Sequence, residues 1–304
     1  MKIIDAHCHL GDILYAGGGG IIGLSGVKKN IIFDPISIWQ FFLNRNFGMG
    51  NFLYKLFLPF VIRAEQARNK AATSENALKS MEDSGITAAA LMPIPPYVTF
   101  SDLLAAARSN NAFIPFTGAY LSDMENLEQR LGADVAAGAR GLKLHSIIQK
   151  VRLNDRRMME AVEAFEKFRL PVLFHAGISS YYGAGESQRN MPEYGSIQDA
   201  RDLATAFPRV NFIAGHAGMF EVQEVIGLLG GLDNVRVDTS FQSPGMIKKL
   251  IRAFGAERIL FASDWPFGSM QPAKRAVIAA CGKDDVLKNK IFYKNAASLM
   301  GLDG

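Results

Sequence analysis

The sequence predicts an α/β fold, a (β/α)₈ barrel of the TIM-barrel type, because short apolar runs alternate with segments of helical spacing along the chain. The apolar runs are rich in Val, Ile, Leu and Ala, and we expect them to be strands at residues 2–9, 86–93, 112–119, 139–145, 171–176, 210–216, 235–240 and 258–264. They are apolar on both faces, which is typical of parallel strands buried between a barrel core and a helical layer. An open, doubly wound sheet would instead carry a glycine-rich turn after its first strand, where this chain has His-Cys-His.

Helical spacing predicts the connections between these strands. We expect helices at residues 76–84, 123–137, 154–168, 196–207, 221–229, 244–254, 271–280 and 285–300. Gly85 is expected to end the first of them, since glycine readily adopts the left-handed conformation of a helix C-cap. Asp123 is expected to be the N-cap of the second. Each such helix can return the chain to a parallel neighbouring strand by a right-handed crossover.

Residues 11–72 interrupt this alternation as a long insertion after the first strand. The segment begins with the flexible Gly17–Gly20, and its aromatic residues are Trp39, Phe41, Phe42, Phe47, Phe52, Tyr54, Phe57 and Phe60. We expect a helical excursion that packs on the barrel, forms a lid over its mouth or makes a contact in a homodimer. A helix lying on a membrane surface is a further alternative. Residues 1–304 are expected to form one domain, since barrels of this length fold as a unit.

The composition is that of an ordinary globular protein, with 49% hydrophobic and 20% charged residues. The net charge of +4 suits an anionic small molecule. No block of Lys and Arg is interleaved with aromatic residues, so we expect no nucleic-acid partner. The two cysteines, Cys8 and Cys281, predict reduced thiols and a cytoplasmic location. No apolar run is long enough to predict a signal peptide or a transmembrane segment.

The chain has five histidines, and each falls at the carboxyl end of a predicted strand. They are His7, His9, His145, His175 and His216, and Asp264 ends the last predicted strand. In a (β/α)₈ barrel these strand ends meet at one mouth, where active sites lie. A single histidine in such a position is more often a core residue, but the whole set predicts a functional site.

His7 and His9 form the start of a metal site. They are two residues apart on a strand, so both point to the same face and Cys8 points to the other. His175 adds a third imidazole and Asp264 a carboxylate, which together make a ligand set suited to Zn²⁺ or another divalent ion. Because a structural zinc site is usually closed and rich in Cys, we expect an open, catalytic site.

Five segments of the chain resemble the amidohydrolase superfamily, specifically the amidohydrolase-related group (amidohydrolase 2) that includes aminocarboxymuconate-semialdehyde decarboxylase-like proteins. They are Ile4–Asp12 (IDAHCHLGD), Gly141–His145 (GLKLH), Pro171–Gly177 (PVLFHAG), Phe212–Gly218 (FIAGHAG) and Ile259–Gly268 (ILFASDWPFG). They occur in the family's order and span nearly the whole chain, whereas the insertion 11–72 lies outside the resemblance. The resemblance implies a metal-dependent enzyme whose metal is held by His7, His9, His175 and Asp264.

The resemblance also implies roles for His216 and Lys143. His216 faces the substrate, acts in proton transfer or joins a second metal. In binuclear relatives such as dihydroorotase-like enzymes, a lysine on the strand of Lys143 is carbamylated and bridges two ions. Alternatively, Lys143 stays an ammonium that pairs with a substrate carboxylate, or is neutralised by a carboxylate of the barrel. We favour one ion, with Lys143 and His145 as substrate contacts and Trp265 as a pocket wall.

Hydrolysis is the predicted reaction. The ion supplies an activated water, Asp264 accepts its proton, and His216 polarises the carbonyl of an amide, lactone or ester in a small, anionic substrate. A metal-dependent, non-oxidative decarboxylase (a carboxy-lyase) of the same superfamily is the first alternative. A metal-dependent nuclease is disfavoured, because no inward glutamate lies on the strands predicted at 112–119 and 139–145. A barrel that binds a ligand without turnover is the alternative from another class of protein.

Overall fold

The structure, a computed structural model, describes residues 1–38 and 50–302. Its strands are parallel and pair in the order of the sequence. One sheet consists of β1 (Ile4–Cys8), β2 (Ala88–Leu91) and β3 (Phe113–Pro115). The other consists of β4 (Thr117–Gly118), β5 (Leu142–Leu144), β6 (Val172–Phe174), β7 (Phe212–Ala214), β8 (Val235–Asp238) and β9 (Ile259–Leu260). Parallel neighbours require crossover connections, which the helices between them provide.

One seam between the two sheets lies within the third predicted strand, 112–119. Only Phe116 separates β3 from β4, and its N–H donates to Leu91 O at 2.9 Å. Pro115, which has no N–H to donate, is the last residue of β3, and its carbonyl oxygen accepts from Arg140 N–H at 2.9 Å. The chain thus passes from the first sheet into the second without leaving the wall of the barrel.

The second seam joins β1 to the segment that follows β9. Cys8 pairs with Trp265 in parallel, and Ala6 N–H donates to Phe261 O at 2.9 Å. These backbone contacts bring the last strand of the second sheet beside the first strand of the other. The predicted (β/α)₈ barrel is therefore confirmed, with all eight predicted strand regions in its wall.

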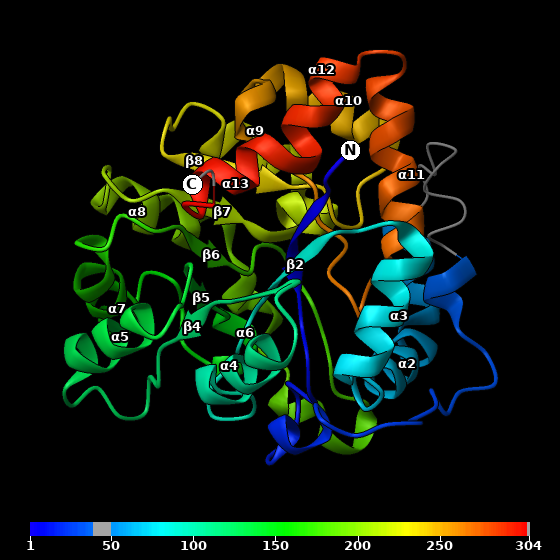
Figure 1. Ribbon diagram of the computed structural model, residues 1–304, viewed down its shortest axis with the longest axis horizontal. Coiled ribbons are helices and arrows are strands. Elements are labelled where there is room, and N and C mark those ends of the chain that lie inside the picture. Colours follow the sequence, from blue (N-terminus) through cyan, green and yellow to red (C-terminus); the bar gives the residue numbers. More distant parts are fainter. Residues whose placement is uncertain (39–49, 303–304) are drawn as a thin grey trace.

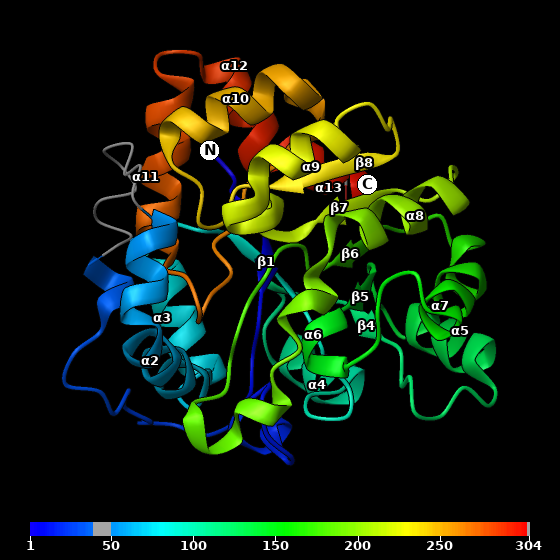
Figure 2. The same cartoon turned by 180° about the vertical axis from the view of Figure 1, so that it is seen from behind.

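The helices form a layer around the strands (Figures 1 and 2). They are α2 (Gly50–Asn69), α3 (Ser74–Ser84), α4 (Phe100–Ser109), α5 (Leu127–Ala136), α6 (Ser146–Gln149), α7 (Arg156–Glu166), α8 (Ile197–Ala206), α9 (Val222–Leu229), α10 (Pro244–Phe254), α11 (Met270–Cys281), α12 (Asp285–Asn289) and α13 (Asn295–Leu299). Helices that follow neighbouring strands pack together, as α5 does with α7 and α10 with α11.

The predicted N-cap of α5 is wrong. The helix begins at Leu127, and its N-cap residue is Asn126, which has a left-handed φ of 52°. The Asp123 carboxylate instead accepts hydrogen bonds from Arg130 and from the backbone N–H of Glu125. Asp123 therefore closes a turn before the helix, a position that short acidic side chains also favour.

Two further helical regions differ from the prediction. α4 is not predicted by apolar spacing, but it begins with a capping box in which the side chains of Thr99 and Asp102 bond to each other's backbone N–H. The final helix predicted at 285–300 consists of α12, a π-helical turn at Lys290–Lys294 and α13. Gly85 ends α3 with a φ of 63°, which confirms that prediction.

Alternate residues of the strands face the helices or the barrel interior. On β6, Val172 and Phe174 belong to the large core under the helices, whereas Leu173 belongs to a smaller cluster that also contains Ile213. His175 follows Leu173 by two residues and shares its inward face. The smaller apolar cluster therefore fills the barrel one layer before the histidines along the strands.

The described part of the insertion packs on the barrel through α2. Val61 and Ala64 are buried together with Ile36, and the partly buried Phe220, which follows β7, packs against them. Four of the aromatic residues assigned to a homodimer contact, at 39–47, lie outside the described residues, so that contact stays a prediction. No helix in the described ranges is both long and apolar enough to cross a bilayer.

Candidate metal centre

β1 presents His7 and His9 with their tautomers fixed by hydrogen bonds. His7 Nδ1–H donates to Asp238 Oδ2 at 2.9 Å, and His9 Nδ1–H donates to Met92 O at 2.9 Å. Both acceptors hold the proton on Nδ1, so each ring keeps its lone pair on Nε2, as metal-binding histidines do. Cys8, between them, is buried in the core under the helices.

Asp264 lies in the turn after β9 and faces both rings. Its Oδ1 is 3.5 Å from His7 Nε2 and 3.4 Å from His9 Nε2. This oxygen is buried and has no hydrogen-bond partner. The residue has a left-handed φ of 54°, and its backbone N–H donates to His7 O at 2.9 Å. The turn thereby holds the carboxylate against the end of β1.

His175 follows β6 and has one nitrogen without a partner. Its Nε2–H donates to Gly177 O at 3.0 Å, which leaves the lone pair on Nδ1. That Nδ1 is buried and makes no hydrogen bond. The ring lies beside His216, with centroids 5.1 Å apart, and His216 in turn stacks on His7 at 4.9 Å. The ring of His216 therefore contacts both His175 and His7, and it connects His175 with the group of His7, His9 and Asp264.

These unpartnered atoms fit a divalent cation. A buried polar atom without a partner costs ~1–3 kcal/mol, so native structures rarely keep one without a ligand. Asp264 Oδ1 and His175 Nδ1 are two such atoms, and ligand atoms of His7, His9 and Asp264 lie within 4.8 Å of one another. Nitrogen and oxygen donors of this kind suit zinc and similar ions. The structure thus brings the predicted ligands to one end of the barrel, while their role as ligands stays a prediction.

Burial keeps the five histidines neutral. It lowers the pKa of His175 to about 3, and it lowers the pKa of each of the other four well below its usual value. The nearby charge of Lys143 acts in the same direction on every one of them. A neutral imidazole is the form that binds a metal, so the electrostatics of the site agree with its geometry.

Lys143 lies directly against the proposed ligands. Its Nζ is 3.0 Å from His7 Nε2, and the residue is only 1% exposed. Burial lowers the pKa of Lys143 to about 8, although the carboxylates of Asp264 and Asp238 act to raise it. The residue therefore has the position that either a bridging carbamate or a contact to a substrate carboxylate requires.

Asp238 connects histidines from two strands. Besides holding His7, it accepts hydrogen bonds from the backbone N–H of His216 at 3.0 Å and from Ser240 Oγ–H at 2.6 Å. Ser240 Oγ in turn accepts from His216 Nδ1–H at 2.8 Å, which leaves the lone pair of His216 on Nε2. His216 adopts a left-handed φ of 58° in this arrangement. The position of Asp238 at the end of its predicted strand, 235–240, already indicates a partner for a ligand histidine, or else a cap of the following helix, and the structure pairs it with His7.

His145 is held by the loop that follows β6. Its Nδ1 accepts from Ile148 N–H at 3.3 Å, so the proton is on Nε2, which lies 3.3 Å from Tyr181 Oη. The ring also stacks on His175, with centroids 4.3 Å apart and an interplanar angle of 12°. His145 therefore lies beside the metal-site histidines, and Tyr181 from the loop after β6 is its partner. Its contact with substrate stays a prediction.

The family profile described as Amidohydrolase matches residues 4–302. The chain belongs to the amidohydrolase family. This is a family of metal-dependent enzymes, in agreement with the resemblance of the strand-end motifs. The bounds of the match enclose the insertion 11–72. No curated protein matches the chain.

Solved structures similar to this amidohydrolase share its fold over nearly the full length. An uncharacterized TIM-barrel protein from Bordetella bronchiseptica has a TM-score of 0.68 and 16% identity, over 99% of each chain. 5-Carboxyvanillate decarboxylase from Novosphingobium aromaticivorans, in a complex with manganese, has a TM-score of 0.66 and 15% identity, over 99% of this chain and 96% of its own. A probable 2-pyrone-4,6-dicarboxylic acid hydrolase from Acinetobacter baumannii has a TM-score of 0.59 and 13% identity, over 99% of this chain and 100% of its own. At these identities the likeness shows the TIM-barrel fold alone.

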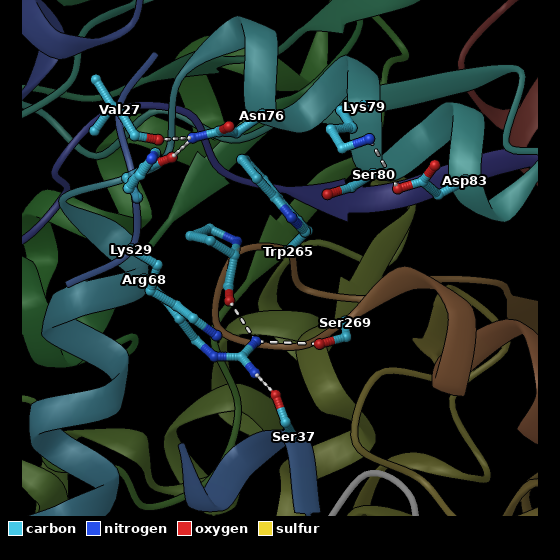
Figure 3. A pocket seen from close by; sticks show the side chains of 13 residues that line it. Val27, Lys29, Ser37, Arg68, Asn76, Lys79, Ser80, Asp83, Trp265 and Ser269 are labelled. Atoms are coloured by element: carbon cyan, nitrogen blue, oxygen red, sulfur yellow. Dashed lines mark hydrogen bonds and ion pairs between the residues drawn. The ribbon is translucent and has the colours of Figure 1, made fainter. Parts of the chain in front are cut away.

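Trp265 of the amidohydrolase lines a pocket of about 420 Å³ between α2, α3 and the turn after β9 (Figure 3). Among the described residues, no histidine lines this pocket. Arg68 borders it and donates to Pro266 O at 3.1 Å, to Ser269 Oγ at 3.1 Å and to Ser37 Oγ at 2.8 Å. The predicted contact of Trp265 with substrate stays a prediction, and its ring faces a pocket apart from the histidine cluster.

Glu65 of the amidohydrolase is a buried acid that the sequence analysis missed. It lies on α2, in the insertion, and is 6% exposed. The insertion was interpreted from its aromatic residues, and its acids received no weight. The available signal was an acid at the centre of a stripe with helical spacing whose other members are Val61, Ala64, Arg68 and Asn69.

Proposed function

We propose that this amidohydrolase is a metal-dependent hydrolase that acts on an amide, lactone or ester of a small, anionic substrate. The proposed ligands of Zn²⁺, or of a similar divalent ion, are His7, His9, His175 and Asp264. The observation that carries the proposal is the pair of buried, unpartnered atoms, Asp264 Oδ1 and His175 Nδ1, beside two imidazoles whose lone pairs are on Nε2. Manganese is a second candidate ion, since a similar structure holds it.

When bound, a divalent ion would supply a Lewis acid that polarises a carbonyl oxygen and acidifies water. Asp264 would take the proton of the attacking water, because its buried Oδ1 has no hydrogen-bond partner and lies beside the Nε2 atoms of His7 and His9. The same carboxyl group could then return the proton to the leaving atom. Loss of such an acid–base group typically lowers the rate by ~10²–10⁴.

His216 suits proton acceptance better than polarisation of a carbonyl. Its Nδ1–H is used by Ser240 Oγ, so the nitrogen left for a substrate is a lone-pair acceptor. We therefore assign His216 to an N–H or O–H group of the substrate, in place of the carbonyl contact expected from the sequence. Lys143, buried beside His7, would pair with the substrate carboxylate, and one ion remains the favoured stoichiometry.

Non-oxidative decarboxylation is the second candidate reaction. After accepting a proton, the carboxyl group of Asp264 could protonate a carbon as CO₂ leaves. The fold is also that of solved 5-carboxyvanillate and 2,6-dihydroxybenzoate decarboxylases. The two reactions make different products, since only decarboxylation releases CO₂ from an aromatic carboxylate.

Metal analysis of the purified protein, followed by a screen of lactones, amides, esters and aromatic carboxylates, tests the proposal. We expect stoichiometric divalent metal and metal-dependent turnover of one of the hydrolysable classes. Release of CO₂ without hydrolysis would select the second candidate. A protein that holds no stoichiometric metal after loading and turns over none of these compounds would favour a barrel that only binds a ligand.

A further inference from the structure

The buried face of α2 carries an acid at its centre. Val61, Ala64, Glu65, Arg68 and Asn69 are all less than 8% exposed, and their spacing by three and four places them on one face of the helix. Val61 and Ala64 pack in an apolar cluster. A surface helix usually turns an apolar stripe to the protein, so the charged second half of this face needs another explanation.

The second half of α2 contacts loops that follow three different strands. Arg68 Nη1–H donates to Pro266 O, after β9, at 3.1 Å. Asn69 Nδ2–H donates to Asp12, after β1. Gln66 Nε2–H donates to the backbone oxygen of Tyr181, after β6, at 3.0 Å. Because the carboxyl ends of barrel strands meet at the mouth, these contacts place the helix across the end of the barrel that holds the histidines.

Glu65 lacks the partners that its neighbours have. Its Oε2 is buried without a hydrogen bond, whereas Arg68 is fully engaged by Asp34 and by the turn after β9. Burial raises the pKa of Glu65 to about 8, and the charge of Arg68 opposes this only in part. Glu65 also lies close enough to Asp264 for the charges of the two carboxyl groups to interact. Functional residues are often buried acids of this kind, which lack a partner in the protein and lie near another charged group of the site.

We propose that Glu65 is a substrate-contacting residue of the metal site, which donates a hydrogen bond from its protonated carboxyl group to a carboxylate oxygen of the bound substrate. The proposal rests on the proposed function, and it adds a residue that would make the enzyme specific for an anionic substrate. A carboxyl group paired with a carboxylate makes a strong, charge-assisted hydrogen bond. The insertion thereby supplies a group that the barrel strands do not carry, and α2 is the lid that the sequence analysis considered.

The binding test uses the full chain loaded with Mn²⁺ and 4-hydroxy-3-methoxy-5-nitrobenzoate, an aromatic carboxylate found in a similar solved structure. Glu65→Gln keeps a hydrogen-bond donor, Glu65→Leu removes it, and Glu82→Leu on the exposed face of α3 is the matched control. Calorimetric titration should show roughly 10- to 100-fold weaker binding for Glu65→Leu and near wild-type binding for Glu65→Gln at pH 7. At pH 9 the ionised Glu65 repels the probe, so wild type should bind more weakly than Glu65→Gln.

The charged groups around Glu65 are common to all these proteins. They are Arg68 on the same helix, Asp264 after β9, and Asp34, which pairs with Arg68. A comparison of wild type with Glu65→Gln at each pH therefore isolates Glu65 from the titration of its surroundings and of the probe.

Thermal unfolding and metal content provide the second readout. Removal of an unpartnered carboxyl group should leave the melting temperature of Glu65→Leu equal to or above that of wild type, with metal content unchanged. A lowered melting temperature in both Glu65 variants, or unchanged affinity for the probe in Glu65→Leu, would overturn the proposal, as would a metal-loaded wild type that does not bind the probe at millimolar concentration. A wild type that binds no metal would overturn the proposed function instead, and the melting temperatures would then decide whether Glu65 has a structural role.

Discussion

Asp238 Oδ2 accepts the Nδ1 proton of His7 across 2.9 Å, and this contact decides which nitrogen of His7 faces the interior of the barrel. Asp238 is fully buried, as is His7, and comes from β8, which β9 separates from β1 in the wall of the barrel. A carboxylate behind a metal-binding imidazole fixes its tautomer and raises its basicity. The proposed metal site is therefore supported by a strand that supplies none of its ligands.

Replacement of Asp238 by Asn should weaken metal binding by ~10–100-fold, because the amide is a poorer acceptor for the His7 Nδ1 proton. Competition with a chromogenic chelator measures this affinity. Asp233→Asn, at an exposed position before β8, is the matched control and should bind metal like wild type. Equal affinities of Asp238→Asn and wild type would show that His7 does not depend on this partner.

His175→Ala and Asp264→Asn should both abolish turnover of a substrate found by screening, but for different reasons. His175→Ala removes a ligand and should lower metal content. Asp264→Asn keeps an oxygen donor but loses the acid–base group, so its rate should fall by at least ~10²-fold even where metal is retained. Metal content measured beside turnover separates the two effects. Full metal and activity in His175→Ala would remove that residue from the ligand set.

The account predicts a stability difference between wild type and Glu65→Gln that depends on pH. The pKa of Glu65 is 4.5 in its ordinary environment, and burial raises it to about 8 in the folded chain. Between these values the folded state holds a proton that the unfolded state has lost, so the contribution of Glu65 to stability is complete below pH 4.5 and decreases as pH rises to about 8.

Glu65→Gln does not titrate, so its stability should exceed that of wild type increasingly from pH 5 to pH 8. At ~1.4 kcal/mol per pKa unit the full effect is on the order of several kcal/mol. Urea unfolding at a series of pH values measures the difference. Parallel curves for the two proteins over this range would mean that Glu65 is already ionised in the folded chain.

We expect the chemical state of Lys143 to determine the number of ions that the proposed site holds. With an uncarbamylated Lys143, the metal-to-protein ratio should approach one and should not depend on bicarbonate during loading. Metal analysis of wild type loaded with and without bicarbonate, beside Lys143→Gln, tests this. A ratio near two that requires bicarbonate and is lost in Lys143→Gln would instead support a bridging carbamate.

The positions of the metal-site residues were predictable because strand periodicity and barrel topology determine them. His7 and His9 share a face through their two-residue spacing, and every strand of a parallel barrel ends at the same mouth. Asp238 was recognisable as a partner of a ligand histidine from its position at the end of a strand, whereas the bond from His9 to Met92 O could not be predicted, because this backbone oxygen becomes a neighbour of His9 only when the strands pair.

Features of the loops and of the insertion were harder to predict. The position of Glu65 across the mouth depends on side-chain contacts of α2 with three distant loops, and Tyr181 reaches His145 from a loop without regular periodicity. Asp123 failed as a predicted cap because an acidic residue before a helix can equally close a turn, and only the three-dimensional contact with Arg130 distinguishes the two.

The most direct test of the account is the anomalous diffraction of crystals soaked in Mn²⁺ or Zn²⁺. We predict one strong peak bounded by His7 Nε2, His9 Nε2, His175 Nδ1 and an oxygen of Asp264, at ordinary ligand distances of ~2.0–2.2 Å. Crystals in which the ion binds elsewhere, or in which these four groups turn away from one another and no peak appears between them, would contradict it.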